Sequence, residues 1–232
     1  MDTVLITGAG RGLGLSLTEK FLAMGNLVVA GYLGSPENLL NLSNTYAGQL
    51  ITVRLDVTAE AEVAKVAADM ANRTGSLDIL INNAGIHLKQ AYLPLEEIDF
   101  TSMLTTLQVN TLGPLKVAKH FIGLLEKGSR KLLVNISSEA GSISECWRER
   151  EFDYCMSKAA LNMQSKIMQN YLKPRGIKIL AVHPGWMRTD MGGEKADIAP
   201  EEAAEGIYNL TQKQWGLDEG IYYDYSGKTM NW

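Results

Sequence analysis

Tyr154 and Lys158 stand four residues apart in the stretch DYCMSK (residues 153–158), which continues into AALNMQ. In a helix, side chains at this spacing share one face, so the phenol and the ammonium would be neighbours. An ammonium about 4 Å from a phenolate stabilises it by about 4 kcal/mol at an effective dielectric of ~20. Lowering the pKa of a phenol from about 10 to about 8 needs only about 2.7 kcal/mol of such stabilisation. Burial opposes this effect. The pair predicts a tyrosine that exchanges protons near neutral pH, although ordinary surface helices also show this spacing.

A glycine-rich segment, TGAGRGLG (residues 7–14), follows the first apolar run and opens the first segment of helical periodicity. Gly8, Gly10, Gly12 and Gly14 remove side chains where backbone must approach a ligand, and a helix N-terminus offers free N–H groups to phosphate. The spacing differs from G-x-G-x-x-G, and glycine-rich turns also occur without ligands. Its place at the first strand-to-helix junction favours a phosphate-binding role.

The elements that must position these residues alternate along the chain. We expect strands at 3–8, 26–33, 49–58, 77–85, 130–138, 176–185 and near 220–225, and helices at 13–25, 36–47, 59–75, 96–126 with a break near 110–114, 154–172 and 200–214. Such alternation is typical of parallel strands with right-handed crossovers. It predicts an α/β fold over residues 1–232: a single-domain, Rossmann-like, doubly wound parallel sheet of about seven strands with helices on both faces. Ligands of such sheets bind beyond the carboxyl ends of the strands.

Composition narrows the class of partner. The 232 residues are 46% hydrophobic and 21% charged, with a net charge of −4, which argues against a nucleic acid or an anionic membrane surface. No apolar stretch approaches the ~20 residues that span a bilayer, and MDTVLITG lacks the features of a secretory signal. Cys146 and Cys155 have no metal-ligand spacing. We therefore expect a cytoplasmic protein with free thiols, no metal, and no nucleic-acid or membrane partner.

Five motifs occur in order: TGAGRGLG, NNAG (82–85), NISS (135–138), YCMSK (154–158) and PGWMRT (184–189). Together they resemble the short-chain dehydrogenase/reductase family over essentially the whole chain. The ending GIYYDYSGKTMNW, and GSIS after the serines, are similar to its C-factor/sniffer-type carbonyl reductase branch. The resemblance implies an enzyme that transfers a hydride between a nicotinamide cofactor and a small carbonyl or alcohol substrate.

The resemblance also implies four catalytic residues. Tyr154 would give a proton to the carbonyl oxygen, or take it in the reverse direction. Lys158 would lower the phenol pKa and bond the nicotinamide ribose hydroxyls. Ser138 would hydrogen-bond the substrate oxygen, with Ser137 as its rival. Asn110 would interrupt its helix and link Lys158 to solvent through water, the alternative being a helix cap.

Cofactor contacts are expected at the carboxyl ends of the strands. By resemblance, Asp56 would accept a hydrogen bond from the adenine amino group, although a lone Asp there also suits a turn. Asn82 would pack beside the adenine-side ribose and brace the sheet. The loop after strand 176–185 would contact the carboxamide. The predicted cofactor-binding set is Gly8, Gly10, Arg11, Gly12, Leu13, Gly14, Asp56, Val57, Asn82, Ala84, Gly85, Tyr154, Lys158, Pro184, Gly185, Met187 and Thr189.

The choice between dinucleotides depends on the end of the second strand. NAD-selective proteins place an acid there to bind the ribose hydroxyls, but AGYLGS (30–35) has no acid before Glu37. Arg11, inside the glycine loop, is suited to a 2′-phosphate, unless it points to solvent. We expect NADP(H) to be favoured, with NAD(H) possible.

Helix 154–172 carries two apolar stripes, more than one sheet contact needs. Because family members often pair this helix across a two-fold axis, we expect a homodimer or homotetramer, although core methionines would explain part of the pattern. The preceding segment, EAGSISECWREREFD (139–153), is bulky and charged where many relatives have small residues. It is expected either to select the substrate or to form a solvated bulge.

Two other functions remain open at this point. One is a dinucleotide-binding signalling or regulatory protein of the same fold with little turnover, against which the complete Ser–Tyr–Lys–Asn set argues. The other is a sugar-nucleotide epimerase or dehydratase of the extended branch. Those chains are longer and have a different glycine spacing, which argues against that function here.

Overall fold

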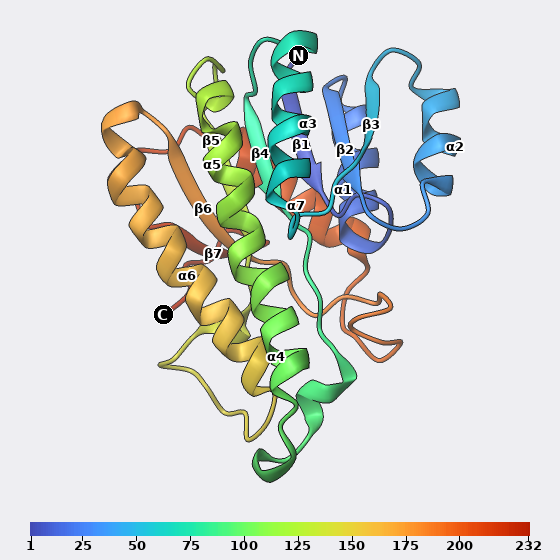
Figure 1. The fold of residues 1–232 in the computed structure, drawn as a ribbon. Helices are drawn as coiled ribbons and strands as arrows, with labels where there is room; N and C mark the ends of the chain where they lie inside the picture. Colours follow the sequence, from blue (N-terminus) through green and yellow to red (C-terminus); the bar gives the residue numbers. More distant parts are fainter.

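Seven strands form one parallel sheet in the order β3-β2-β1-β4-β5-β6-β7 in the computed structural model, which describes residues 1–232 (Figure 1). The predicted doubly wound α/β sheet is confirmed. The order reverses between β1 and β4, which is where ligands of such sheets bind. The strands are β1 Thr3–Thr7, β2 Leu27–Tyr32, β3 Leu50–Arg54, β4 Ile79–Asn82, β5 Leu132–Ile136, β6 Lys178–His183 and β7 Tyr222–Asp224.

Helices cover both faces of the sheet (Figure 1). One face packs against α1 (Gly12–Ala23) and α7 (Pro200–Gln212), with α2 (Glu37–Thr45) at the β3 end. The other packs against α3 (Glu60–Arg73), α5 (Gly113–Leu125) and α6 (Phe152–Leu172), while α4 (Phe100–Leu107) continues the line of α5 beyond the sheet.

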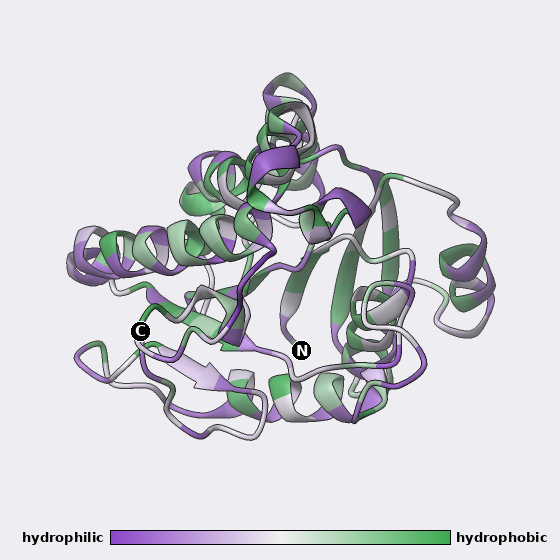
Figure 2. Ribbon diagram, turned by 90° about the horizontal axis from the view of Figure 1, so that it is seen from below, coloured by the Kyte–Doolittle hydropathy of each residue, from purple (hydrophilic) through white to green (hydrophobic).

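The strands read as continuous apolar runs because both of their faces are buried. Along β1, Val4 and Ile6 belong to the core under α1 and α7, whereas Leu5 belongs to the core under α3 and α5. The hydropathy view shows the same arrangement, with apolar strands between helices that turn polar residues outward (Figure 2). No helix is both long and apolar enough to cross a membrane.

The break expected near 110–114 is present as a π-helical turn over Gln108–Leu112, between α4 and α5. Pro114 then stands in the first turn of α5, directly after the π-helical turn. Several strands are shorter than predicted. The run expected as strand 77–85 leaves the sheet after Asn82, so residues 83–85 form a loop at the carboxyl edge.

Candidate active site

The glycine loop is held tightly against the segment that follows β4. Gly8 has φ of 66°, and a Cβ there would lie 2.9 Å from Ala84 Cα. A Cβ on Gly14 would lie 2.2 Å from the Gly8 carbonyl oxygen, so a side chain at this position would push α1 off the loop. The Asn83 amide donates to the carbonyls of Thr7 (2.9 Å) and Gly8 (3.2 Å). The sequence singled out Asn82, yet Asn83 is the residue that fixes this loop.

The first turn of α1 has the free groups that an anion needs. No side chain caps the helix, and its first turn contains no acid. Its first N–H groups and the positive end of the dipole therefore have no competing carboxylate. A Cβ on Gly12 would lie 3.4 Å from the Thr189 methyl carbon, which brings the loop after β6 to this point. The residues present fit the pyrophosphate of a dinucleotide.

Tyr154 and Lys158 lie on the same side of α6. The Lys158 ammonium is 5.7 Å from the centre of the Tyr154 ring. It donates to the Ile136 carbonyl at the end of β5 (2.9 Å), its one hydrogen bond within the chain, and two further N–H groups remain for a ligand. Lys158 is buried, and burial lowers the pKa of its ammonium from 10.5 to about 8.

The pKa of the Tyr154 phenol is raised, whereas the sequence led us to expect that Lys158 would lower it. Burial raises the pKa of the phenol from 10.0 to about 12, the neighbouring Ser138 hydroxyl lowers it in part, and the carboxylates of Glu139 and Glu151 raise it further. The expected lowering by Lys158 is therefore wrong for this chain by itself, because burial disfavours the phenolate more than the nearby cations favour it.

Ser137 and Ser138, which the sequence left as rivals, have different surroundings. The Ser137 hydroxyl donates to Asn162 Oδ1 on α6 (2.6 Å), so it is engaged inside the core. The Ser138 hydroxyl accepts from the Ala140 N–H (3.1 Å), and it is near enough to the Tyr154 phenol to lower the pKa of that phenol. Tyr222 on β7 donates to the Ser138 carbonyl (2.7 Å) and so fixes the turn.

Asn110 lies in the π-helical turn and is buried. Its Oδ1 accepts from the Ile86 N–H (2.8 Å), and its Nδ2 donates to the Ile86 carbonyl (2.9 Å) and to Ser157 Oγ (3.1 Å). Thus the side chain ties the loop after β4 to α6 and does not cap a helix. A Cβ on Gly85 would lie 3.4 Å from Asn110 Oδ1 and 3.8 Å from Lys158 Nζ, which places Gly85 beside both side chains.

Other predicted contacts also gather at the carboxyl edge. Asp56 Oδ1 accepts from the Thr58 N–H (2.8 Å) and hydroxyl (2.7 Å), which makes it a turn residue whose second oxygen has no partner. Asn82 braces the sheet by donating to Asn135 Oδ1 (2.9 Å), and its own Oδ1 is buried without a partner. Buried side chains of this edge include Leu13 and Val57.

The loop after β6 begins at Pro184 and turns at Gly185, which has φ of 82°. A Cβ there would lie 2.7 Å from Ile198 Cδ1, so the turn requires glycine. Met187 forms a bridge with Ile198, and this closes the loop near Gly12.

Arg11 is exposed at the mouth of the glycine loop, where its guanidinium pairs with Asp190 at 2.5 Å. Both side chains are more than three-quarters exposed, so the pair is screened by solvent. The sequence offered two alternatives for Arg11, a contact to a 2′-phosphate or a side chain that points to solvent. In the structure the side chain is exposed and lies across from the loop after β6, where it pairs with Asp190.

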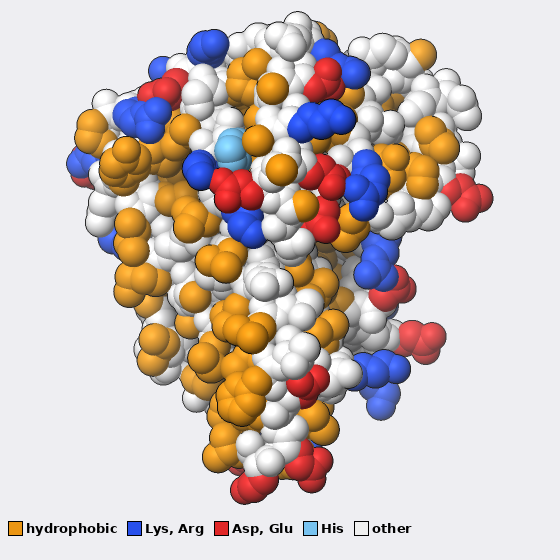
Figure 3. Space-filling model, viewed as in Figure 1, with side chains coloured by type: hydrophobic (Ala, Val, Ile, Leu, Met, Phe, Trp, Pro, Cys, Tyr) orange, Lys and Arg blue, Asp and Glu red, His pale blue; other side chains and the backbone are white.

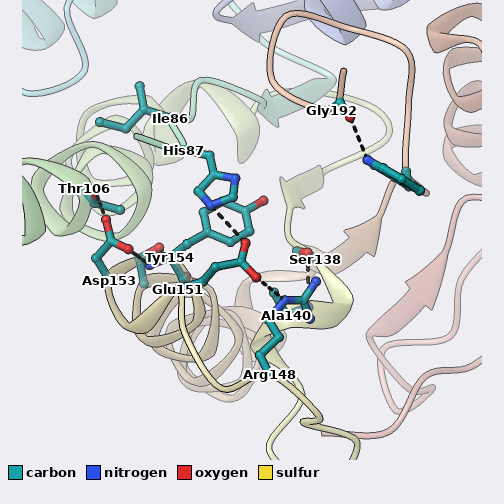
Figure 4. Close-up of polar contacts among 12 residues, drawn as sticks. Ile86, His87, Thr106, Ser138, Ala140, Arg148, Glu151, Asp153, Tyr154 and Gly192 are labelled. Atoms are coloured by element: carbon teal, nitrogen blue, oxygen red, sulfur yellow. Dashed lines mark hydrogen bonds and ion pairs between the residues drawn. The ribbon is translucent and has the colours of Figure 1, made fainter. Parts of the chain in front are cut away.

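A cluster that the sequence did not predict surrounds Tyr154 (Figure 4). The His87 ring stacks on the Tyr154 ring at 4.3 Å between centres, and His87 Nε2 lies 3.0 Å from Glu151 Oε1. Arg148 bonds both Glu151 and Glu139. The alternating charges of WRERE were visible in the sequence, but no pattern showed which of them turn inward.

Comparisons with known proteins agree with this arrangement. Residues 2–199 match the family described as short chain dehydrogenase. The C-signal of Myxococcus xanthus is 33% identical over 159 residues, which cover 68% of this chain and 95% of that protein. The carbonyl reductase Sniffer of D. melanogaster has a TM-score of 0.95 at 29% identity, covering 100% of both chains. The NADPH-bound carbonyl reductase from chicken fatty liver has a TM-score of 0.91 at 32% identity, covering 100% of this chain and 99% of that one.

The resemblance that the five sequence motifs indicated is thus confirmed by a family match over most of the chain and by full-length structural likeness. The chain belongs to the short-chain dehydrogenase family of NAD(P)-dependent oxidoreductases, and within it to the sniffer and C-factor type.

Proposed function

We propose that this chain is a carbonyl reductase that prefers NADPH and uses Tyr154 as its acid. The observation that carries the proposal is the meeting of Tyr154, Lys158 and Ser138 at the carboxyl edge of the sheet, beside the uncapped N-terminus of α1. Asn110 completes the set from the π-helical turn. These residues form one polar group around the end of β5.

The nicotinamide ring supplies or accepts the hydride when the cofactor is bound. Ser138 holds the substrate oxygen, and Tyr154 delivers a proton to it. A phenol with a pKa of about 12 is protonated at neutral pH, which suits carbonyl reduction better than alcohol oxidation. Lys158, with two N–H groups free, holds the ribose hydroxyls of the cofactor.

The preference for NADPH is supported by three features. No acid lies between β2 and Glu37 to bind a free ribose 2′-hydroxyl. Arg11 is exposed at the glycine loop, and exchanging its surface pair with Asp190 for a 2′-phosphate costs at most about 1 kcal/mol. The carbonyl reductase from chicken fatty liver binds NADPH. The cofactor contacts proposed are those predicted above, from Gly8 to Thr189.

We also propose a homodimer through the face formed by α4, α5 and α6. Apolar side chains gather over these helices (Figure 3). Leu161, Met168 and Leu172 face the core, but a second set of large apolar side chains is 44–71% exposed: Phe100, Leu104, Leu112, Leu115, Met156, Met163, Ile167 and Tyr171. A second copy presenting the same face would cover this set. Sedimentation of Ile167→Glu against wild type tests it, and an unchanged mass would exclude this face.

A screen of aldehydes and ketones with NADPH and NADH, in both directions, tests the enzymatic proposal. We expect carbonyl reduction, with kcat/KM higher for NADPH. Tight binding of NADPH without turnover of any carbonyl would instead favour the alternative, a dinucleotide-binding signalling or regulatory protein.

A further inference from the structure

We infer that Arg148 is a positioning residue that clamps the turn carrying Ser138 to the start of the helix carrying Tyr154. The inference rests on the proposed function and names a device within the same site. Glu139 directly follows Ser138, and Glu151 directly precedes α6, three residues before Tyr154. A residue that binds both carboxylates therefore sets the relative placement of the two hydroxyls that act on the substrate oxygen.

The contacts of Arg148 are those of a clamp. Its two terminal nitrogens donate to the two oxygens of Glu139, both at 2.6 Å, and its Nε donates to Glu151 Oε2 at 2.9 Å. A guanidinium forms such forked pairs in a fixed plane, whereas an ammonium does not. The side chains of Arg148 and Glu151 are only 14% and 15% exposed, so water screens this pair much less than it does an ordinary surface pair.

Residues 143–147, 149 and 150 of segment 139–153 are exposed, as in a solvated bulge, whereas the Arg148 side chain is only 14% exposed. Trp147, 75% exposed, places its ring 4.9 Å from the guanidinium. Neighbouring charged residues such as Glu149 and Arg150 remain exposed, so burial is specific to the one arginine that reaches both carboxylates.

Glu151 gives a second, independent indication of the clamp. Its backbone has φ of 63°, a left-handed conformation that residues other than glycine rarely adopt. Such a conformation persists where the surroundings over-determine it. Here its side chain is held by Arg148 and lies against His87, and its N–H donates to the Ala91 carbonyl (2.9 Å).

The clamp reaches the Tyr154 ring through His87. Glu151 Oε1 lies 3.0 Å from His87 Nε2, a buried nitrogen that makes no hydrogen bond. The imidazole ring stacks on the Tyr154 ring with 27° between the ring planes. It also packs against the Tyr92 ring, with 5.2 Å between the ring centres. Glu151 therefore borders the ring that stacks on Tyr154 (Figure 4).

The test compares Arg148→Met, Arg148→Lys and the control Arg150→Met, which removes the same charge from the same segment. Arg150 bonds only the Tyr92 carbonyl (3.0 Å) and touches neither carboxylate. For Arg148→Met we expect kcat for carbonyl reduction to fall roughly 10- to 100-fold, because small misplacements of catalytic groups have effects of this size. The Kd for NADPH should stay near that of wild type, and Arg148→Lys should recover part of kcat.

An imidazole titration followed by NMR supplies a readout that does not depend on turnover. Burial lowers the pKa of His87, the carboxylates of Glu151 and Asp153 raise it, and Arg148 lowers it. Arg148→Met removes one of these charges and frees the Glu151 carboxylate, so it should shift the pKa of His87, whereas Arg150→Met should not. His120, which pairs with Glu60 on another face, is the internal reference. The charged or titratable groups that face His87 are Glu151, Asp153, Arg148, Lys158, Tyr92 and Tyr154.

The outcomes separate the two proposals. Equal losses of kcat in Arg148→Met and Arg150→Met, or equal shifts of the His87 pKa in the two variants, would overturn the clamp while leaving the reductase intact. If Arg148→Met unfolds, Arg148→Lys decides: it keeps the charge but not the fork, and a wild-type kcat would again overturn the clamp. Absence of turnover in the wild-type protein would overturn the proposed function and the positioning role together.

Discussion

Replacing Lys158 with methionine should stabilise the protein at neutral pH while it removes a group proposed for catalysis. Burial lowers the pKa of this ammonium from 10.5 to about 8. Keeping it charged in the folded protein at pH 7 therefore costs about 3 kcal/mol. Methionine has no such cost, but it leaves the Ile136 carbonyl without its hydrogen bond, at about 1–2 kcal/mol. The net expectation at pH 7 is a gain of about 1–2 kcal/mol in the free energy of unfolding.

The gain should vanish as the pH rises. Between pH 8 and 10.5 the unfolded chain still holds the lysine proton while the folded chain has lost it, so the stability of wild type rises across this window. By pH 10 the cost of the charge has fallen to less than about 1 kcal/mol, so the advantage of Lys158→Met should shrink by about 2.5 kcal/mol between pH 7 and pH 10.

Urea unfolding followed by tryptophan fluorescence at both pH values measures this difference directly. Lys166→Met, which removes an exposed lysine from the same helix, is the matched control and should give nearly the same difference at both pH values. Stability differences between Lys158→Met and wild type that stay constant from pH 7 to pH 10 would refute the statement that Lys158 is held in a desolvated site.

Three further predictions concern the loop, the cofactor and the serines. Gly14→Ala should lower the free energy of unfolding, measured in urea, by about 3 kcal/mol or more, because its Cβ would lie 2.2 Å from the Gly8 carbonyl oxygen. The control Gly123→Ala has open space for its Cβ and should raise the free energy of unfolding by up to about 1 kcal/mol. Equal effects of the two substitutions would contradict the packing of the glycine loop. Arg11→Ala should weaken NADPH binding more than NADH binding in titrations, and equal losses would reverse the cofactor preference. Ser138→Ala should lower kcat about 100-fold, whereas Ser137→Ala should mainly lower stability; the reverse pattern would exchange their roles.

Much of the fold could be predicted because its causes are local. Apolar runs such as TVLIT must be strands buried on both faces, and the helices between them show amphipathic spacing. The break near 110–114 was visible because asparagine, glycine and proline gather there. The Tyr154–Lys158 pair was visible because four residues make one helical turn.

The remaining features depend on contacts between distant parts of the chain. The sequence left the choice between Ser137 and Ser138 open, because the hydrogen bond that engages Ser137 goes to Asn162, which is 25 residues away. The raised pKa of Tyr154 reflects burial by several elements, which spacing along one helix does not reveal. Arg148 could not be told from Arg150 for the same reason, since only the folded chain shows which one meets both carboxylates.

The most direct test of the central claim is single-turnover hydride transfer from NADPH to an accepted carbonyl in Tyr154→Phe. Phenylalanine keeps the ring against His87 and removes only the hydroxyl. We expect the transfer rate to fall by about 10³-fold or more, with the Kd for NADPH close to that of wild type. Hydride transfer at the wild-type rate in this variant would show that the Tyr154 hydroxyl is not the acid and would contradict the account.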